Sequence, residues 1–125
     1  DDRIRAARHP QTLSQEATLA AGEIDRVALT EQLRGLAERL ERALALEGLV
    51  TRRLVLKLRY ADGERATRSR SLDRGVATAA DVLALAQDLL ARTHAGSRRV
   101  RHLGLAASGL EHPRRDERQL SLFDR

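Results

Sequence analysis

Basic side chains are concentrated in one part of this 125-residue chain, and the chemistry they could do is the binding of anions. Between positions 51 and 74, eight Arg and Lys residues stand against three Asp and Glu residues, a local excess of five. Guanidinium groups form charge-assisted hydrogen bonds with phosphate oxygens, so this segregation of charge predicts a surface that meets a polyanion. A solvated basic surface is the alternative that composition leaves open.

Residues for covalent or metal chemistry are scarce. The chain has no Cys, which excludes disulfides, thiolate metal ligands and Cys nucleophiles. His9, His94, His102 and His112 lack metal-ligand spacing and are interpreted as surface or sheet residues. No glycine-rich phosphate loop is present in the sequence. We therefore expect a non-catalytic fragment with no catalytic residue, no metal site and no cofactor.

Four stretches have the alternating pattern of apolar and polar residues that is typical of strands. They are residues 11–19, 54–60 and 65–72, and a stretch within 99–110 whose facing the pattern does not decide. Asp62-Gly63 lies between the second and third stretches and predicts a hairpin turn. In the third stretch, Arg68 and Arg70 share one face, and Thr67, Ser69 and Ser71 share the other.

Two segments, 25–47 and 78–93, have apolar residues at helical spacings of three and four. In the first, five leucines form one stripe, Asp25 can cap the beginning, and Gly48 suits the left-handed residue that closes a helix. In the second, Thr78 can cap the beginning, and Gly96 is expected to end the helix. The apolar faces of both predicted helices need a common partner surface.

The predicted order is β-α-β-β-α-β, which indicates an α+β fold with a four-stranded sheet and two helices packed on one face. The helices would cover the leucines of residues 54–60 and leave the other face of the sheet open. Lys57 and Arg59 alternate with those leucines, so they belong to the open face. We expect Arg68 and Arg70 to join them there.

The chain changes character after Gly109. Residues 111–118 are almost all charged and include Pro113, which predicts a flexible tether. Phe123 follows, two residues from the end, and it is the only Phe in a chain with 2% aromatic residues. Its position outside the predicted domain indicates that it binds a pocket on another protein. The segment that carries it reads Gln119, Leu120, Ser121, Leu122 and Phe123.

The strand segments together resemble the C-terminal, or little-finger, domain of the Y-family DNA polymerases, and bacterial members most of all. Residues 11–19, Gln-Thr-Leu-Ser-Gln-Glu-Ala-Thr-Leu, are similar to its first strand, with Gln11 replacing the usual Lys and Leu19 the usual Phe. The change at Gln11 removes one charge expected to face the DNA backbone. Residues 54–60, 67–72 and 100–110 resemble the second, third and fourth strands, so the resemblance covers essentially the whole chain.

The resemblance implies a domain that lies against duplex primer–template DNA and contacts both backbones without reading the base sequence. The implied hydroxyl donors to phosphate oxygens are Ser14, Thr18 and Ser69. The implied cationic contacts are Arg59, Arg68, Arg70, Arg99 and Arg101. Glu16 is a poor partner for phosphate, so we expect it to orient a neighbouring Arg or to bind a bridging water.

The terminal pentapeptide resembles the motif that binds the bacterial β sliding clamp. Leu120, Leu122 and Phe123 would enter an apolar pocket, with Gln119 hydrogen-bonded at its rim and Ser121 between them. The resemblance also implies that the parent protein is a DNA polymerase whose palm carboxylates hold two Mg²⁺ ions. Asp1 and Asp2 belong to the linker and are not those carboxylates.

Several expectations concern the domain boundaries of the chain, its oligomeric state and its location in the cell. We expect a linker from the preceding thumb at 1–10, the domain at 11–110, the tether at 111–118 and the clamp-binding tail at 119–125. The chain lacks Met, which suggests a piece cut from a longer protein. No apolar run approaches the length that crosses a bilayer, so we expect no membrane partner. We also expect a monomer with a cytoplasmic, nucleoid-associated location.

Three alternatives remain open. The first is the same domain from a catalytically inactive relative that acts as an adaptor in damage-induced mutagenesis. The second is an RNA-binding domain of the same topology, which would stack bases on aromatic residues of the sheet, where only Tyr60 is available. The third is a ligand-sensing or purely structural module, which would leave the Phe123 tail unexplained.

Overall fold

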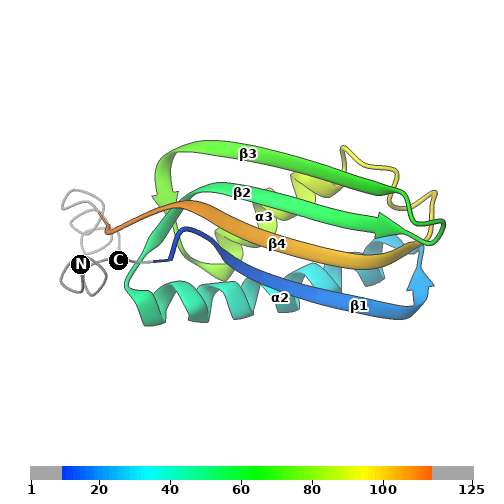
Figure 1. The fold of residues 1–125 in the computed structure, drawn as a ribbon, viewed down its shortest axis with the longest axis horizontal. Coiled ribbons are helices and arrows are strands. Elements are labelled where there is room, and N and C mark those ends of the chain that lie inside the picture. Colours follow the sequence, from blue (N-terminus) through cyan, green and yellow to red (C-terminus); the bar gives the residue numbers. More distant parts are fainter. Residues whose placement is uncertain (1–9, 114–125) are drawn as a thin grey trace.

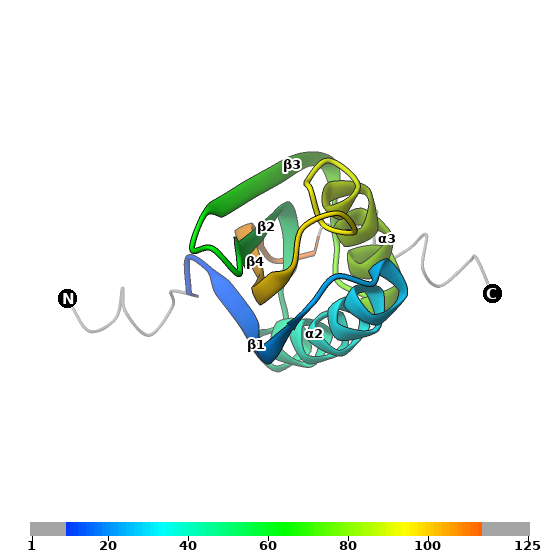
Figure 2. The same ribbon diagram turned by 90° about the vertical axis from the view of Figure 1, so that its right-hand side faces the viewer.

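Two helices cover one side of a four-stranded antiparallel sheet in the computed structural model, which describes residues 10–113 (Figures 1 and 2). The elements are β1 (Leu13–Glu23), α2 (Arg26–Glu47), β2 (Val50–Tyr60), β3 (Arg65–Val76), α3 (Ala79–Leu90) and β4 (Val100–Glu111). The strand order is β1-β4-β2-β3, so β1 and β3 are the edges. This confirms the predicted β-α-β-β-α-β fold. No helix in this part of the chain is long and apolar enough to span a membrane.

The helices begin where their capping residues predict. The Asp25 carboxylate accepts a hydrogen bond from the Ala28 backbone N–H at 3.0 Å, and the Thr78 hydroxyl accepts one from the Asp81 N–H at 3.2 Å. Gly48 closes α2 in the left-handed region, with φ 67°. The predicted end of α3 was wrong: the helix stops at Leu90, capped by Ala91, and Gly96 lies in the following loop.

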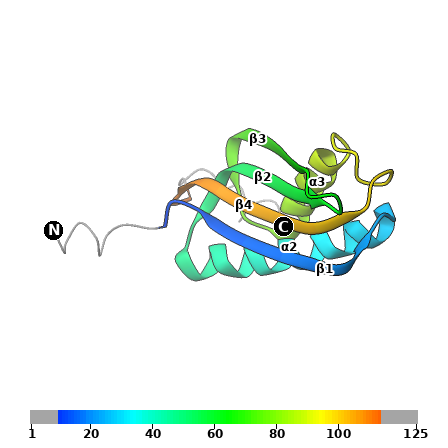
Figure 3. The same ribbon diagram turned by 45° about the vertical axis from the view of Figure 1, so that its right-hand side comes forward.

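The core lies between the sheet and the helices. All five leucines of the predicted stripe on α2 are buried, and they belong to one core cluster with the leucines of β2 and β4. Leu56 and Leu58 of β2 are cross-strand partners of Leu105 and Leu103 of β4, so these four side chains form one apolar layer. Figure 3 shows the arrangement: α2 packs against β1 and β4, and α3 packs against β2 and β3.

Residues 61–64 join β2 to β3, and the hydrogen bonding of Tyr60 with Glu64 leaves a loop of three residues, 61–63. The Tyr60 N–H donates to the Glu64 carbonyl at 2.8 Å, and the Gly63 N–H donates back to the Tyr60 carbonyl at 2.9 Å. Gly63 has φ 92°, a conformation that side chains disfavour. The loop therefore makes Arg59 and Arg65 direct cross-strand partners.

Arg98, from the loop before β4, holds this hairpin. Its guanidinium lies 3.9 Å from the centroid of the Tyr60 ring and donates to the Asp62 carboxylate at 2.7 Å. It also forms an ion pair with Glu64. The Glu64 backbone N–H, together with Arg98, keeps the pKa of Asp62 below its ordinary value of 3.8, and the hydrogen bond to Glu64 raises the pKa of Arg98.

Thr51 is the one polar side chain buried among the residues that the structure describes, and it lies where the β2–β3 register shifts. Its Oγ1 lies 2.6 Å from the Ser108 carbonyl oxygen and 2.9 Å from the Arg53 carbonyl oxygen. The Arg53 N–H also donates to this oxygen, at 3.3 Å. The hydroxyl therefore satisfies backbone groups that the bulge removes from the regular ladder.

Replacing Thr51 by Val should destabilise the domain by about 1–3 kcal/mol, because the shape is kept while buried backbone groups lose their partner. Thr51→Ser keeps the hydroxyl and should cost less, roughly the value of one methyl group. Urea denaturation of both variants measures the difference. An equal or larger loss for the Ser variant would show that the hydroxyl does not support the bulge.

Asp62→Asn should make the domain less sensitive to acid. A carboxyl group whose pKa is lowered by folding contributes stability above its unfolded value, and this contribution is lost as the pH falls through the folded pKa. Wild-type protein should therefore lose more thermal stability than Asp62→Asn between about pH 5 and pH 3. Glu38→Gln, on the exposed side of α2, is the matched control and should follow the wild type.

Candidate nucleic-acid interface

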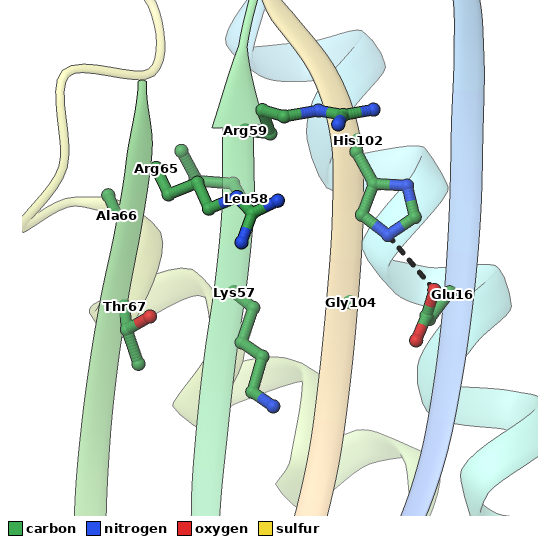
Figure 4. Close-up of a pocket in the computed structure, with 9 residues that line it drawn as sticks. All are labelled: Glu16, Lys57, Leu58, Arg59, Arg65, Ala66, Thr67, His102 and Gly104. Atoms are coloured by element: carbon green, nitrogen blue, oxygen red, sulfur yellow. Dashed lines mark hydrogen bonds and ion pairs between the residues drawn. The ribbon is translucent and has the colours of Figure 1, made fainter. Parts of the chain in front are cut away.

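The face of the sheet that the helices leave uncovered carries polar and basic side chains from all four strands. The cross-strand pairs place Ser14, Glu16 and Thr18 of β1 beside Ala106, Gly104 and His102 of β4. On the other half they place Arg53, Val55, Lys57 and Arg59 of β2 beside Ser71, Ser69, Thr67 and Arg65 of β3. Figure 4 looks onto this open face, with the helices behind the sheet.

Lys57, Arg59 and Arg65 are available to an external partner. Within the part of the chain that the structure describes, none of them has a side-chain hydrogen bond or ion pair. Arg59 and Arg65 lie directly opposite each other, an arrangement of like charges that disfavours the pairing of their strands. Arg53 is differently placed, because its guanidinium donates to the Ser69 hydroxyl at 3.1 Å.

These three cations line the β2 and β3 side of a hollow of about 450 Å³ on the open face (Figure 4). Gly104 forms part of its floor, and Thr67, His102 and Glu16 also line it. A Cβ atom at Gly104 would lie 3.5 Å from the Glu16 side chain and would add bulk between β1 and β2. The absence of a side chain at this position keeps the middle of the sheet open to a ligand.

The β1 side of the face has hydroxyl groups and one carboxylate in place of unpaired cations. Ser14 and Thr18 are exposed there, as their predicted role requires. Glu16 lies 3.0 Å from His102 Nε2, and Thr18 Oγ1 lies 3.3 Å from His102 Nδ1. Glu16 was expected to orient a neighbouring Arg or to bind a bridging water, and the partner of its carboxylate in the structure is instead His102. Its backbone carbonyl, however, accepts a hydrogen bond from Arg39 of α2 at 2.9 Å.

The placement of Arg68 and Arg70 on the open face was wrong. They are the cross-strand partners of Leu56 and Leu54, whose side chains face the helices. Arg68 accordingly donates to the Arg92 carbonyl at 3.0 Å, and Arg70 lies 3.7 Å from the Asp88 carboxylate of α3.

The cause of this error is the length of the hairpin loop. A two-residue turn at Asp62-Gly63 would pair Arg68 with Lys57, on the open face. The loop has three residues, 61–63, which shifts the register of β3 by one. A shift of one residue moves every side chain of a strand to the opposite face. The hydroxyls of Thr67 and Ser69 therefore lie on the open face, which the predicted alternation had given to Arg68 and Arg70.

Arg99 and Arg101 lie at the end of the sheet where the β1–β4 register shifts. Both are exposed, and their side chains pass over Gly22 of β1, where a Cβ atom would lie 2.6 Å from Arg99 Cγ. Arg99 also donates to the Gly22 carbonyl, at 3.4 Å. These two residues form a separate basic group at the β1 edge.

Several open-face residues were absent from the predicted DNA-binding set: Arg53, Lys57, Arg65, Thr67 and His102. Strand alternation could have identified Arg53 and Lys57, since both are in phase with Arg59. Arg65 and Thr67 required the hairpin register. His102 required the facing of β4, which the sequence pattern did not decide.

The predicted clamp-binding residues Gln119, Leu120, Ser121, Leu122 and Phe123 lie outside the described residues, as do residues 1–9 of the linker predicted at 1–10. Within 10–113, no group of three or more His, Cys, Asp or Glu residues could hold a metal ion. The candidate site in this range is therefore the open face itself.

Comparison with known proteins agrees with the fold. Residues 10–122 match the model of the impB/mucB/samB family C-terminal domain. The chain is 40% identical over 114 residues to a DNA polymerase IV of Halorhodospira halophila, covering 91% of this chain and 32% of that protein. It is 35% identical over 121 residues to a DNA polymerase IV of Alkalilimnicola ehrlichii, covering 96% of this chain and 34% of that protein. The chain thus spans about a third of these relatives.

Solved structures share the architecture. A post-insertion binary complex of Dbh DNA polymerase superposes with a TM-score of 0.68 at 15% identity, over 81% of this chain and 29% of that one. A Y-family DNA polymerase chimera of Dbh and Dpo4 gives a TM-score of 0.70 at 15% identity, over 84% of this chain and 30% of that one. With a family match over nearly its whole length, the chain belongs to the impB/mucB/samB family and is its C-terminal domain, the little finger of the Y-family DNA polymerases.

Proposed function

We propose that this domain holds primer–template DNA for a translesion DNA polymerase, with the open face of the sheet against the sugar–phosphate backbone. The contacts would be independent of base sequence, because they join cations and hydroxyl groups to phosphate oxygens. The names of the relatives support the parent activity: the two similar curated proteins are DNA polymerases IV. A cytoplasmic location at the nucleoid follows from this role.

One observation carries the proposal: Arg59 and Arg65 lie directly opposite each other without an acidic partner in the described part of the chain. Like charges at opposed positions destabilise a sheet, so a domain built for stability alone would place a carboxylate or an uncharged residue at one of them. A polyanion relieves this repulsion when it binds. Lys57 extends the same group of cations toward the centre of the face.

The RNA-binding alternative finds little support in this face. Domains that bind single-stranded RNA on a sheet stack bases on exposed aromatic rings. Tyr60 is 3% exposed, lies in the core and has its ring under Arg98, and the open face of the described strands has no Phe, Tyr or Trp. Hydroxyls and cations, with the His102 imidazole as the one ring among them, suit the outside of a duplex better than unpaired bases.

The same proposal includes the sliding clamp as a second partner. The sequence Gln119 to Phe123 follows a charged segment, and three of its side chains are apolar. Burial of such side chains is worth about 1.5–3 kcal/mol each before the cost of ordering the peptide, so micromolar affinity is the expected order. Tethering to a clamp already on the DNA would strengthen the attachment.

Catalysis would be supplied by the remainder of the parent protein. In the proposed polymerase, two Mg²⁺ ions are held by palm carboxylates that precede this domain. The adaptor alternative has the same domain without an active palm, and the sequence before Asp1 distinguishes the two.

Arg65→Thr should weaken duplex binding and stabilise the free domain. Removing one phosphate contact should lower the slope of log affinity against log salt by about 0.9, equally for unrelated duplexes. Relief of the repulsion with Arg59 should raise the free energy of unfolding by roughly 0.2–1 kcal/mol. Fluorescence anisotropy with a labelled duplex and urea denaturation measure the two effects.

Arg70→Thr is the matched control, because it makes the same change on the same strand but on the helix side. It should leave duplex affinity within about twofold of wild type. If it weakens binding as much as Arg65→Thr does, the open face is not the surface that contacts DNA.

Replacing both Leu122 and Phe123 by Ala should abolish clamp binding while duplex affinity stays near the wild-type value. The two side chains supply most of the apolar area of the tail, whereas the open face is unchanged. Surface plasmon resonance with an immobilised bacterial β clamp measures the first property, and anisotropy measures the second. Clamp binding that survives the double substitution would remove the tail from the proposal.

A further inference from the structure

A histidine and a carboxylate lie together beside the cations of the hollow (Figure 4). Among the residues that line it, Glu16 is the one carboxylate and His102 the one imidazole. His102 Nε2 lies 3.0 Å from the Glu16 carboxylate, and His102 Nδ1 lies 3.3 Å from the Thr18 hydroxyl. Both ring nitrogens therefore have partners, and both partners come from β1.

This arrangement suits two protonation states of the ring. In the neutral ring, the Nε2–H donates to Glu16, and Nδ1 accepts a hydrogen bond from the Thr18 hydroxyl. In the charged ring, both nitrogens donate, and the Thr18 oxygen accepts. A proton can thus be gained or lost by rotating one hydroxyl group, without moving the imidazole.

The charges around His102 decide what this proton does. Lys57 and Arg59 from β2 and Arg65 from β3 stand against Glu16 from β1, so the lining has three cations and one carboxylate, a net charge of +2. Protonation of the ring raises this to +3. From the helix side, Arg39 reaches the Glu16 backbone carbonyl at 2.9 Å and leaves the carboxylate to the imidazole.

The geometry points to a proton-linked phosphate-binding site. Lys57, Arg59 and Arg65 bind a phosphate of the DNA backbone over Gly104, and the Glu16–His102 pair takes up a proton as the phosphate binds. This inference rests on the proposed DNA-binding function. A bound phosphate favours the charged form of a nearby imidazole, and by reciprocity the proton strengthens phosphate binding. Imidazole is the side chain suited to such a change of charge, so the affinity for DNA is expected to rise as the pH falls.

The test is the pH dependence of duplex affinity, measured by anisotropy with the 125-residue chain at constant ionic strength. Wild-type affinity for the duplex should rise about three- to tenfold from pH 8.5 to pH 5.5, because the complex would bind the proton up to about tenfold more tightly than the free domain does. His102→Gln should lose this rise. The matched control is His94→Gln, outside the hollow, which should keep it.

Two further measurements make the result specific. Calorimetry near pH 6.5, in two buffers of different ionisation enthalpy, should show proton uptake on duplex binding by wild type but not by His102→Gln. Glu16→Gln should strengthen binding at pH 8.5 while keeping the rise toward acid, because the carboxylate charge is removed and the imidazole remains.

The outcomes separate this inference from the function on which it rests. If wild type and His102→Gln bind duplex with the same pH dependence and the same proton uptake, the inference of a proton-linked phosphate-binding site is wrong, and the proposed DNA binding stands. If wild type fails to bind duplex at any pH in this range, the proposed function itself is wrong.

Discussion

The hairpin between β2 and β3 determines which side chains the sheet presents to its surroundings. Side chains alternate along a strand, so the loop length sets which alternate set of β3 residues joins the outward set of β2. Three loop residues, with Gly63 in the left-handed region, bring Arg65 beside Arg59 and send Arg68 and Arg70 to the helix side. Arg98 stabilises this loop through its contacts with Tyr60 and Asp62. These contacts have no role on the open face, yet they help to maintain the register that determines which side chains the open face carries.

The two faces of the sheet differ in what they contribute to stability. The helix side is built almost entirely from leucine, valine and alanine, with Tyr60 as its one ring. The open side gains little from packing, and at Arg59 and Arg65 it carries a repulsion that lowers stability. The cations gather over β2 and β3, whereas β1 offers hydroxyls and Glu16. A duplex on this surface would therefore meet two chemically different rows of contacts.

Local patterns in the sequence predicted most of the fold. The Leu stripe of α2, its Asp25 and Gly48 ends, and the Thr78 cap are short-range signals, and the structure confirms them. The resemblance of the strand segments to the little finger also pointed to the family that the comparisons show. Alternation alone placed Lys57 and Arg59 correctly.

The errors and omissions arise where the answer depends on residues distant in the chain or on loop geometry. The facing of Arg68 and Arg70 depended on one extra loop residue, for which Asp62-Gly63 gives no unique signal. The pairing of Glu16 with His102 joins residues 86 positions apart, so neither strand predicts it alone. The end of α3 was set by tight turns after Leu90, although Gly96 resembled a helix terminator.

Arg68 and Arg70 acquire another significance from their position on an outermost strand. A strand with a free edge offers unpaired backbone groups to any second sheet, and bulky charged side chains beside that edge discourage such fusion. The two guanidinium groups, held to α3 and the loop that follows it, keep charge along the rim of β3. Edge-to-edge pairing of β3 between two copies of this domain is therefore disfavoured.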